Sequence, residues 1–290
     1  WDWDEKMYDD PGAFFDWIHE RGMEVTLNVH PLRIREDDSH FEPFVEAVGG
    51  HERVADAEYN KKPFRKIDID ICDKEQALPF MHICHDAFAE MGLDYWWVDG
   101  TRGRMNGVDD QLVGSKLYWE SVASEEKRGM LLSRYGGLGT HRYGVFFTGD
   151  TASCWNILKM QCEFNIRAGH LGLAYVSHDI GGFFSPAKTP LVHPELFVRW
   201  VQFGAFNPVF RFHSAPGSGS REPWDYGEAY GGIAKRWLQV RHSLLPYLYS
   251  AARVHYETGV PIARGLFLED SDDEECYRFD EFYFGESILV

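Results

Sequence analysis

Three aspartates in this chain each stand just after a short apolar run. Asp99 follows the run at 95–98, Asp150 follows the run at 145–148, and Asp179 follows the run at 173–177. Two carboxylates that face each other across a sugar can hydrolyse a glycosidic bond, because one attacks the anomeric carbon while the other protonates the leaving oxygen. A group of carboxylates can equally hold a divalent cation. The three aspartates therefore indicate either glycoside hydrolysis or a metal site.

Basic side chains close three further apolar runs. His30 follows residues 24–29, Arg134 follows residues 130–133, and His213 follows residues 209–212. If all six runs are parallel strands of one curled sheet, the polar residues lie at one rim, which is where α/β barrels carry their active sites. The alternative is that these are unrelated charges on surface loops. The repeated placement at strand ends favours the rim.

Other chemistries find less support in the sequence. There is no HExxH and no His-x-His, and the histidines stand singly, so a metal centre ranks below glycoside hydrolysis and we expect neither a metal nor another cofactor. A serine nucleophile would need a GxSxG turn, which is missing. Residues 217–220 read Gly-Ser-Gly-Ser without the lysine of a phosphate-binding loop, and we interpret them as a flexible loop near the active site.

The elements that position these residues alternate between strand and helix. Apolar positions recur with helical period at 13–18, 77–91, 155–166 and 196–204, and helices are expected near 116–127 and over 233–256, where Pro246 should introduce a kink. Residues 32–75 show no sustained period and are predicted to be an irregular excursion with a short helix near 41–48. Six strands alternating with helices predict an α/β fold, an incomplete (β/α)8 TIM barrel that contains strands three to eight.

The sequence predicts two domains. Residues 1–258 form the partial barrel, and residues 259–290, with alternating Phe282 and Phe284, begin a C-terminal β-sandwich domain. The chain opens at Trp1 without an initiator methionine or a signal peptide, so we expect its N-terminus to be truncated.

Composition limits the partners. The formal charge is -17 and no long basic run occurs, which argues against nucleic acid and against an anionic membrane surface. The 10 Trp, 14 Tyr and 21 Phe exceed what a core alone needs, and aromatic faces stack on sugar rings. Five scattered cysteines without a CxxC indicate free thiols. An oligosaccharide or glycoside is the expected partner, whereas the compartment and the oligomeric state are not indicated.

Several segments together resemble glycoside hydrolase family 31, whose members are retaining α-glycosidases on a (β/α)8 barrel. These segments are Trp96-Trp97-Val98-Asp99, Arg134 with Arg142, Gly149-Asp150 with Trp155, the run His178 to Phe183, Arg199-Trp200, and Arg211-Phe212-His213-Ser214. The resemblance runs from about residue 3 to the C-terminus, and the order and spacing of the segments make it specific.

The resemblance implies a role for each matching residue. Asp99 would be the catalytic nucleophile at the end of the fourth strand, and Asp150 the general acid/base after the sixth. The residues implied to bind the sugar are Asp179, His213, Arg134, Trp97 and Trp155, and the rim residue His30 and the loop residue Arg142 complete the candidate set. Two readings stay open, since Trp97 could belong to the barrel core and Arg142 could pair with a structural carboxylate.

The implied function is removal of terminal α-linked sugars by an exo-acting, α-glucosidase-like enzyme. One departure leaves the sugar open: Gly100-Thr101-Arg102 stands where many members have Met-Asn-Glu or Trp-Gln-Gln, and Arg104 adds a further charge. An α-galactosidase, an α-xylosidase, an α-N-acetylgalactosaminidase or an inactive carbohydrate-binding homologue are the alternatives.

Overall fold

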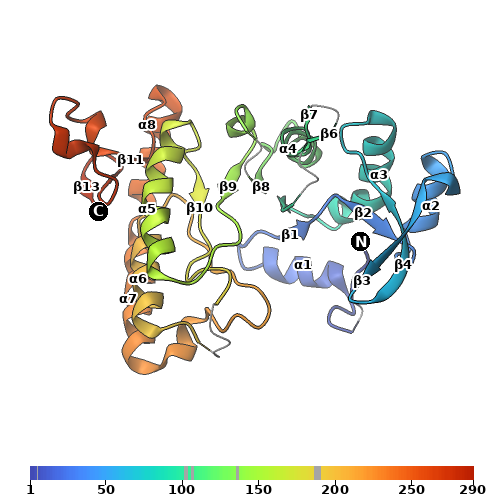
Figure 1. Cartoon of the computed structure of the whole chain (residues 1–290), viewed down its shortest axis with the longest axis horizontal. Helices are drawn as coiled ribbons and strands as arrows, with labels where there is room; N and C mark the ends of the chain where they lie inside the picture. The colour runs from blue at the N-terminus through green and yellow to red at the C-terminus, as the bar shows by residue number, and fades with distance from the viewer. Residues whose placement is uncertain (5, 101–103, 106–107, 135–136, 186–190) are drawn as a thin grey trace. The chain divides into compact units, whose positions relative to one another are not determined.

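The structure is a computed structural model that describes residues 1–290 except 5, 101–103, 106–107, 135–136 and 186–190 (Figure 1). The chain divides into two compact units, Trp1–Gly144 and Val145–Val290. Each unit carries parallel strands followed by helices, the alternation of a partial α/β barrel, and the second unit ends in a small antiparallel sheet.

The parallel strands of the first unit are β1 (Thr26–Val29), β5 (Tyr95–Val98) and β8 (Leu131–Ser133), with β5 in the middle. Val29 pairs with Val98, and Val98 pairs with Ser133. Because the three strands end in register, the next residue of each strand emerges at the same edge of the sheet.

Helices α1 (Pro11–His19) and α3 (Lys74–Glu90) form over the segments in which apolar positions recur with helical period. The side chain of Asp10 accepts a hydrogen bond from the Ala13 N–H at the start of α1, and Asp73 does the same for Glu75 at the start of α3. The inner face of α3 packs on β5, where Phe88 meets the ring of Trp96 edge-on at 5.8 Å. Helix α4 (Asp110–Ser121) starts earlier than predicted, because its inner face carries polar residues and shows no apolar period.

The excursion at 32–75 is more regular than the sequence predicted. It forms an antiparallel sheet of β2 (Arg33–Arg35), β4 (Lys62–Asp68) and β3 (Val54–Tyr59), beside the expected short helix α2 (Phe41–Ala47). Asn60 and Lys61 join β3 to β4 with φ of 52° and 62°, as a tight hairpin requires. The prediction of an irregular segment was wrong because β3 is solvated on both faces and therefore lacks an apolar alternation.

The second unit holds β9 (Val145–Phe147) and β10 (Val176–Ser177), which are parallel. Its helices are α5 (Trp155–His170), α6 (Pro194–Ala205), α7 (Gly232–Ser243) and α8 (Leu245–Thr258) (Figure 1). The expected strand at 209–212 is present only as single parallel bridges, Val209 to Ser177 and Phe212 to Ile180. The helix predicted at 233–256 is two helices, because Pro246 lies in the first turn of α8 and ends the hydrogen bonding of α7.

The C-terminal segment forms an antiparallel sheet of β11 (Ala263–Arg264), β12 (Tyr283–Phe284) and β13 (Ile288–Leu289). Phe282 and Phe284 are buried, as their alternation predicted, in a cluster with Ile166 and Ile262. A short pair, β6 (Arg104–Met105) and β7 (Val108–Asp109), follows Asp99 in the first unit. None of the helices in the described ranges combines the length and the apolarity that crossing a membrane requires.

Candidate active site

Asp99 emerges at the carboxyl edge of the first unit's parallel sheet between two basic side chains. Its N–H donates to the Val29 carbonyl at 2.9 Å, which holds it beside His30. His30 Nε2 lies 3.5 Å from Asp99 Oδ2, and Arg134 Nε donates to Asp99 Oδ1. The Asp99 side chain keeps 15% of its surface exposed, so the carboxylate is oriented by these partners and still accessible from solvent.

Gly100, the residue after Asp99, has room for a small side chain next to His30. A methyl group added at Gly100 would touch His30 Nδ1 at 3.7 Å, an ordinary van der Waals contact. The departure at Thr101 and Arg102 lies outside the described residues. The side chain of Arg104 is likewise outside what the structure describes.

In the second unit, Asp150 follows β9 on a turn made by Gly149, whose φ is 81°. The Asp150 side chain is exposed. Asp179 follows β10 and is only 1% exposed. Thr148 N–H donates to the Ser177 carbonyl at 3.2 Å, so the segments that lead to the two aspartates run side by side.

Arg211 is a site residue that the sequence analysis quoted without assigning it a role. Its Nη2 donates to Asp179 Oδ1, and its guanidinium carbon lies 5.1 Å from the centre of the Phe147 ring. A signal for it was present in the sequence, since Arg211 stands two positions before His213 and alternate residues of an extended segment share a face.

His213 lies against Phe183, with ring centres 5.3 Å apart. Phe183 is tied in turn to the segment after Asp150, because its N–H donates to the Thr151 carbonyl at 2.7 Å. The second unit thus brings together the loops that carry Asp150, Asp179 and His213. All three were predicted at strand ends.

The remaining candidates occupy different environments. Trp96 and Val98 are buried on the helix side of β5, so Trp97 is on the opposite face, the same face as Asp99. Trp155 is 50% exposed, contrary to the inward packing expected of it on α5. Arg142 is exposed, and its Nε donates to the Gly139 carbonyl of its own loop at 3.1 Å.

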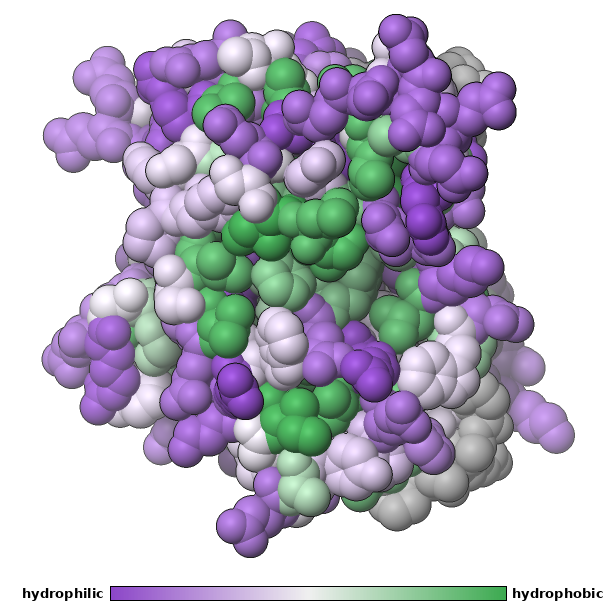
Figure 2. Space-filling view, turned by 90° about the vertical axis from the view of Figure 1, so that its left-hand side faces the viewer, coloured by the Kyte–Doolittle hydropathy of each residue, from purple (hydrophilic) through white to green (hydrophobic). Residues whose placement is uncertain are grey.

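Trp155 belongs to an apolar hollow lined by α5, α6 and the C-terminal segment. The hollow measures about 270 Å³ and is lined by Trp155, Leu158, Lys159, Cys162, Phe203 and Asp280. The face of the second unit that carries α5, α6 and the C-terminal segment shows apolar side chains gathered in a central depression (Figure 2). The role of Trp155 in holding a sugar remains a prediction.

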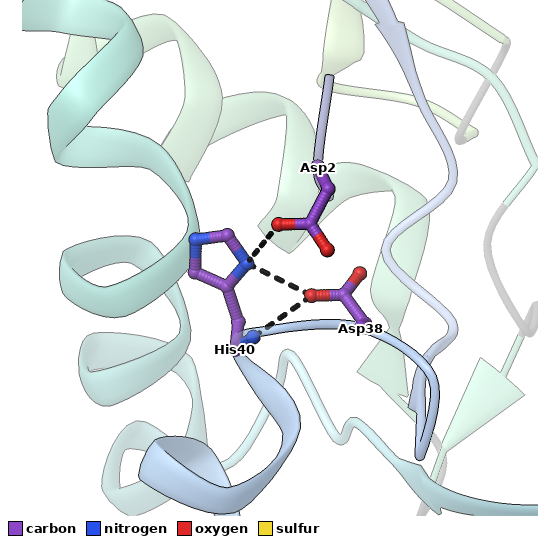
Figure 3. A group of neighbouring side chains, drawn as sticks. All are labelled: Asp2, Asp38 and His40. Atoms are coloured by element: carbon purple, nitrogen blue, oxygen red, sulfur yellow. Dashed lines mark hydrogen bonds and ion pairs between the residues drawn. The ribbon is translucent and has the colours of Figure 1, made fainter. Parts of the chain in front are cut away.

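One group of acids and histidine in the described part of the chain has ligand atoms close enough to hold a metal ion. Asp2, Asp38 and His40 offer atoms that lie within 4.8 Å of one another, with His40 Nδ1 directed at both carboxylates (Figure 3). Asp38 already accepts from the N–H and the ring of His40, and Asp2 accepts from the N–H and the hydroxyl of Ser39. A cation would have to displace these hydrogen bonds, so the group is an internally satisfied network.

Two histidines, His85 and His178, are buried. His178, which is fully buried, has its Nδ1 3.3 Å from Thr148 Oγ1, and burial lowers its pKa to about 3. His85 of α3 pairs with the hydroxyl of Tyr118 at 2.9 Å, and burial again lowers its pKa to about 3. Both imidazoles are therefore neutral and act as uncharged packing and hydrogen-bonding groups.

Parallel strands that present carboxylates, imidazoles and guanidiniums at their carboxyl ends have the arrangement in which α/β barrels build active sites. The chain belongs to glycoside hydrolase family 31: the profile described as "Glycosyl hydrolases family 31 TIM-barrel domain" matches residues 1–251. The members of this family are retaining α-glycosidases.

Characterised relatives share part of the chain. Alpha-glucosidase 2 of Bacillus thermoamyloliquefaciens is 41% identical over 165 residues, which is 57% of this chain and 20% of that protein. Alpha-xylosidase of Saccharolobus solfataricus is 31% identical over 216 residues, which is 73% of this chain and 28% of that protein. The matched parts thus span only 20% and 28% of the length of these two relatives.

Solved structures have the same fold. A GH31 sulfoquinovosidase from E. rectale, in complex with an aza-sugar inhibitor, superposes with a TM-score of 0.84 at 22% identity, covering 100% of this chain and 47% of that one. A GH31 dextranase from Flavobacterium johnsoniae, complexed with glucose, gives 0.82 at 23% identity, covering 100% and 39%.

Proposed function

We propose that the protein of which this chain is part hydrolyses terminal α-linked sugars with retention of configuration. Asp99 attacks the anomeric carbon and forms a covalent glycosyl-enzyme, while Asp150 protonates the glycosidic oxygen. Water activated by Asp150 then releases the sugar as its α-anomer. The mechanism predicts that the two carboxyl groups stand about 5–5.5 Å apart.

The observation that carries the proposal is the setting of Asp99. A nucleophilic carboxylate must be ionised, oriented and reachable, and Asp99 is held by Arg134 and His30 while remaining partly exposed. We assign sugar hydroxyl binding to Asp179, His213 and Arg134, and an aromatic wall to Trp97 and Trp155. His30 and Arg142 stay in the candidate set. As proposed domain limits, residues 1–258 form the catalytic barrel and residues 259–290 open a C-terminal β-domain.

An α-glucoside is the substrate we favour, since several curated relatives are α-glucosidases. An α-xyloside is the second candidate, supported by the α-xylosidase that matches 73% of the chain. A panel of aryl α-glycosides of glucose, xylose, galactose, N-acetylgalactosamine and sulfoquinovose separates these possibilities by their kcat/KM.

The nucleophile is tested by Asp99→Gly, which removes the attacking oxygen and leaves room for a small anion. We expect kcat to fall by about 10³-fold or more. Added azide should then restore turnover and give a β-glycosyl azide, because it attacks from the vacated face. Asp56→Asn on the exposed hairpin is the control and should match the wild type.

An Asp99→Gly variant that still hydrolyses the best aryl glycoside at more than a tenth of the wild-type rate contradicts the assignment. Sugar binding by calorimetry without turnover of any glycoside would indicate the carbohydrate-binding homologue instead. Loss of activity with a strong chelator would favour a metal-dependent hydrolase.

A further inference from the structure

The loop after His213 is held by one buried cation, Arg221. Its side chain is 3% exposed, and its Nη1 donates to the carbonyls of Ser218, Gly219 and Ser220 at 2.9, 3.1 and 3.4 Å. The segment 217–220, expected from its composition to be a flexible loop, therefore wraps around a guanidinium. Buried charge is costly unless its donors are satisfied, and here carbonyl oxygens satisfy them.

The same guanidinium reaches the loop after Asp179. Nε and Nη2 of Arg221 donate to the Gly182 carbonyl at 3.0 and 2.6 Å. The stem of Arg221 also packs closely against Gly181: a methyl group added at Gly181 would lie 2.5 Å from Arg221 Cδ. Arg221 thus joins the turn that follows Asp179 to the loop that follows His213.

The turn is pressed in addition against the segment after Asp150. A methyl group at Gly182 would stand 2.5 Å from Ser153 Cα. Ser153 N–H donates to the Phe184 carbonyl at 2.7 Å, and Ala215 N–H donates to the Phe183 carbonyl at 3.0 Å. Residues 183–184 are therefore bonded on one side to the Asp150 segment and on the other to the His213 segment.

We propose that Arg221 is a positioning residue that clamps the turn after Asp179 to the loop after His213. Because that turn also holds the segment after Asp150, the clamp sets the places of Asp150, Asp179 and His213. Its relevance to catalysis rests on the proposed function, whereas the clamp itself is a property of the fold. Arg221 touches no reacting atom in this scheme and acts through the carbonyls it binds. Lysine could keep the charge but could not bridge two loops, because it lacks the planar, forked set of donors.

Arg241 provides a matched control. It is also a buried arginine, 8% exposed, and its donors likewise go to main-chain carbonyls, those of Ala205, Asn207 and Pro208. Those carbonyls lie before the segment 209–212, at its amino end. Arg221, in contrast, binds carbonyls that lie after the carboxyl end of this segment. Arg241→Lys should cost stability without touching the site.

The clamp is tested by amide hydrogen exchange on the full chain, comparing Arg221→Lys and Arg241→Lys with the wild type. We expect Arg221→Lys to speed exchange about tenfold or more at the N–H groups of Ser153, Phe183 and Ala215, which cross between the loops. The kcat of the best aryl α-glycoside should fall about 10–100-fold, with a smaller change in KM, because misplaced groups cost most in the transition state. Arg241→Lys should leave kcat within about twofold of the wild type, and should speed exchange at the three amides by no more than its loss of global stability does.

Exchange at these three amides that stays within about twofold in Arg221→Lys, or that rises equally in Arg241→Lys, overturns the clamp. If Arg221→Lys does not fold, exchange in the wild type tests the clamp. The three amides should then open together, so that their protection factors agree within about threefold. Protection factors that differ by about 100-fold overturn the clamp. If the wild type hydrolyses no glycoside of the panel, the proposed function fails, and exchange still decides the clamp.

Discussion

The carboxylate of Asp99 accepts from a guanidinium and lies beside an imidazole, and these come from the two strands that flank its own. Arg134 follows β8, and His30 follows β1. An ion pair this close to the sheet edge orients the carboxylate more than it stabilises the fold, since Arg134 keeps 32% of its side chain exposed. At the residue scale, the pairing fixes Oδ1 of Asp99 against Arg134 and leaves Oδ2 beside His30, which is the orientation that the proposed attack requires.

We expect Arg134→Met to lower kcat/KM about 10–100-fold, because a charge-assisted hydrogen bond contributes about 1.5–3 kcal/mol to holding the nucleophile. Stability should change by less than about 1 kcal/mol, since the pair is partly exposed. Steady-state kinetics with the best aryl α-glycoside and urea unfolding measure both effects. Arg128→Gln, an exposed arginine of the same unit, is the control. Wild-type kinetics in Arg134→Met would remove Arg134 from the site.

At the scale of elements, turns that follow the strands do as much positioning as the strands themselves. Strand β10 has two residues, and the segment 209–212 makes only isolated bridges. The turn at Gly181 and Gly182, with φ of 96° and 80°, compensates by packing directly on neighbouring main chain. Only glycine combines this backbone conformation with so close an approach.

Gly182→Ala and Gly217→Ala separate these two requirements. Both glycines have positive φ, 80° and 76°, but an added methyl group at Gly217 meets nothing within 4 Å. We expect Gly217→Ala to cost about 1–2 kcal/mol from backbone strain alone. Gly182→Ala should cost about 1–3 kcal/mol more, because its methyl group overlaps Ser153. Equal free energies of unfolding in urea for the two variants would contradict the close packing of this turn.

At the scale of the whole molecule, each unit contains a buried histidine that is neutral in the native state at neutral pH. His85 lies in the first unit and His178 in the second, and burial lowers the pKa of each to about 3. An unfolded histidine titrates near 6.5. Below pH 6.5 the unfolded chain binds a proton at this histidine, whereas the native state does not. The contribution of the neutral histidine to the free energy of unfolding is therefore fully present above pH 6.5 and is lost as the pH falls toward 3.

Acidification from pH 7 to pH 5 should therefore cost each unit about 2 kcal/mol through its histidine. Urea unfolding at the two pH values measures this loss. His85→Phe and His178→Phe should each remove about 2 kcal/mol of the pH dependence of its unit, whatever they do to stability at pH 7. An unaltered slope in His178→Phe would mean that His178 is protonated in the native state.

Much of the fold follows from local patterns in the sequence. The run at 95–98 is buried on one face because Trp96 and Val98 alternate with Tyr95 and Trp97, and α3 shows its apolar period in full. The elements that were not predicted correctly lack an apolar pattern of their own and are stabilised by contacts with other segments. Strand β3 has no buried residue, the inner face of α4 is polar, and the segment 209–212 pairs with its neighbours only through single bridges.

Residue types at strand ends were enough to nominate Asp99, Arg134 and His30, because parallel strands in register deliver consecutive polar residues to one edge. Asp99 pairs with Arg134, and Asp179 pairs with Arg211. These two pairings depend on side-chain directions, which the spacing of residues in the sequence does not encode. The clamp of Arg221 could not be predicted from residue types, because its partners are main-chain carbonyl groups and every residue has one. Local sequence determines which groups a strand carries to its end, whereas only the packed chain decides which distant main-chain atoms a buried charge will hold.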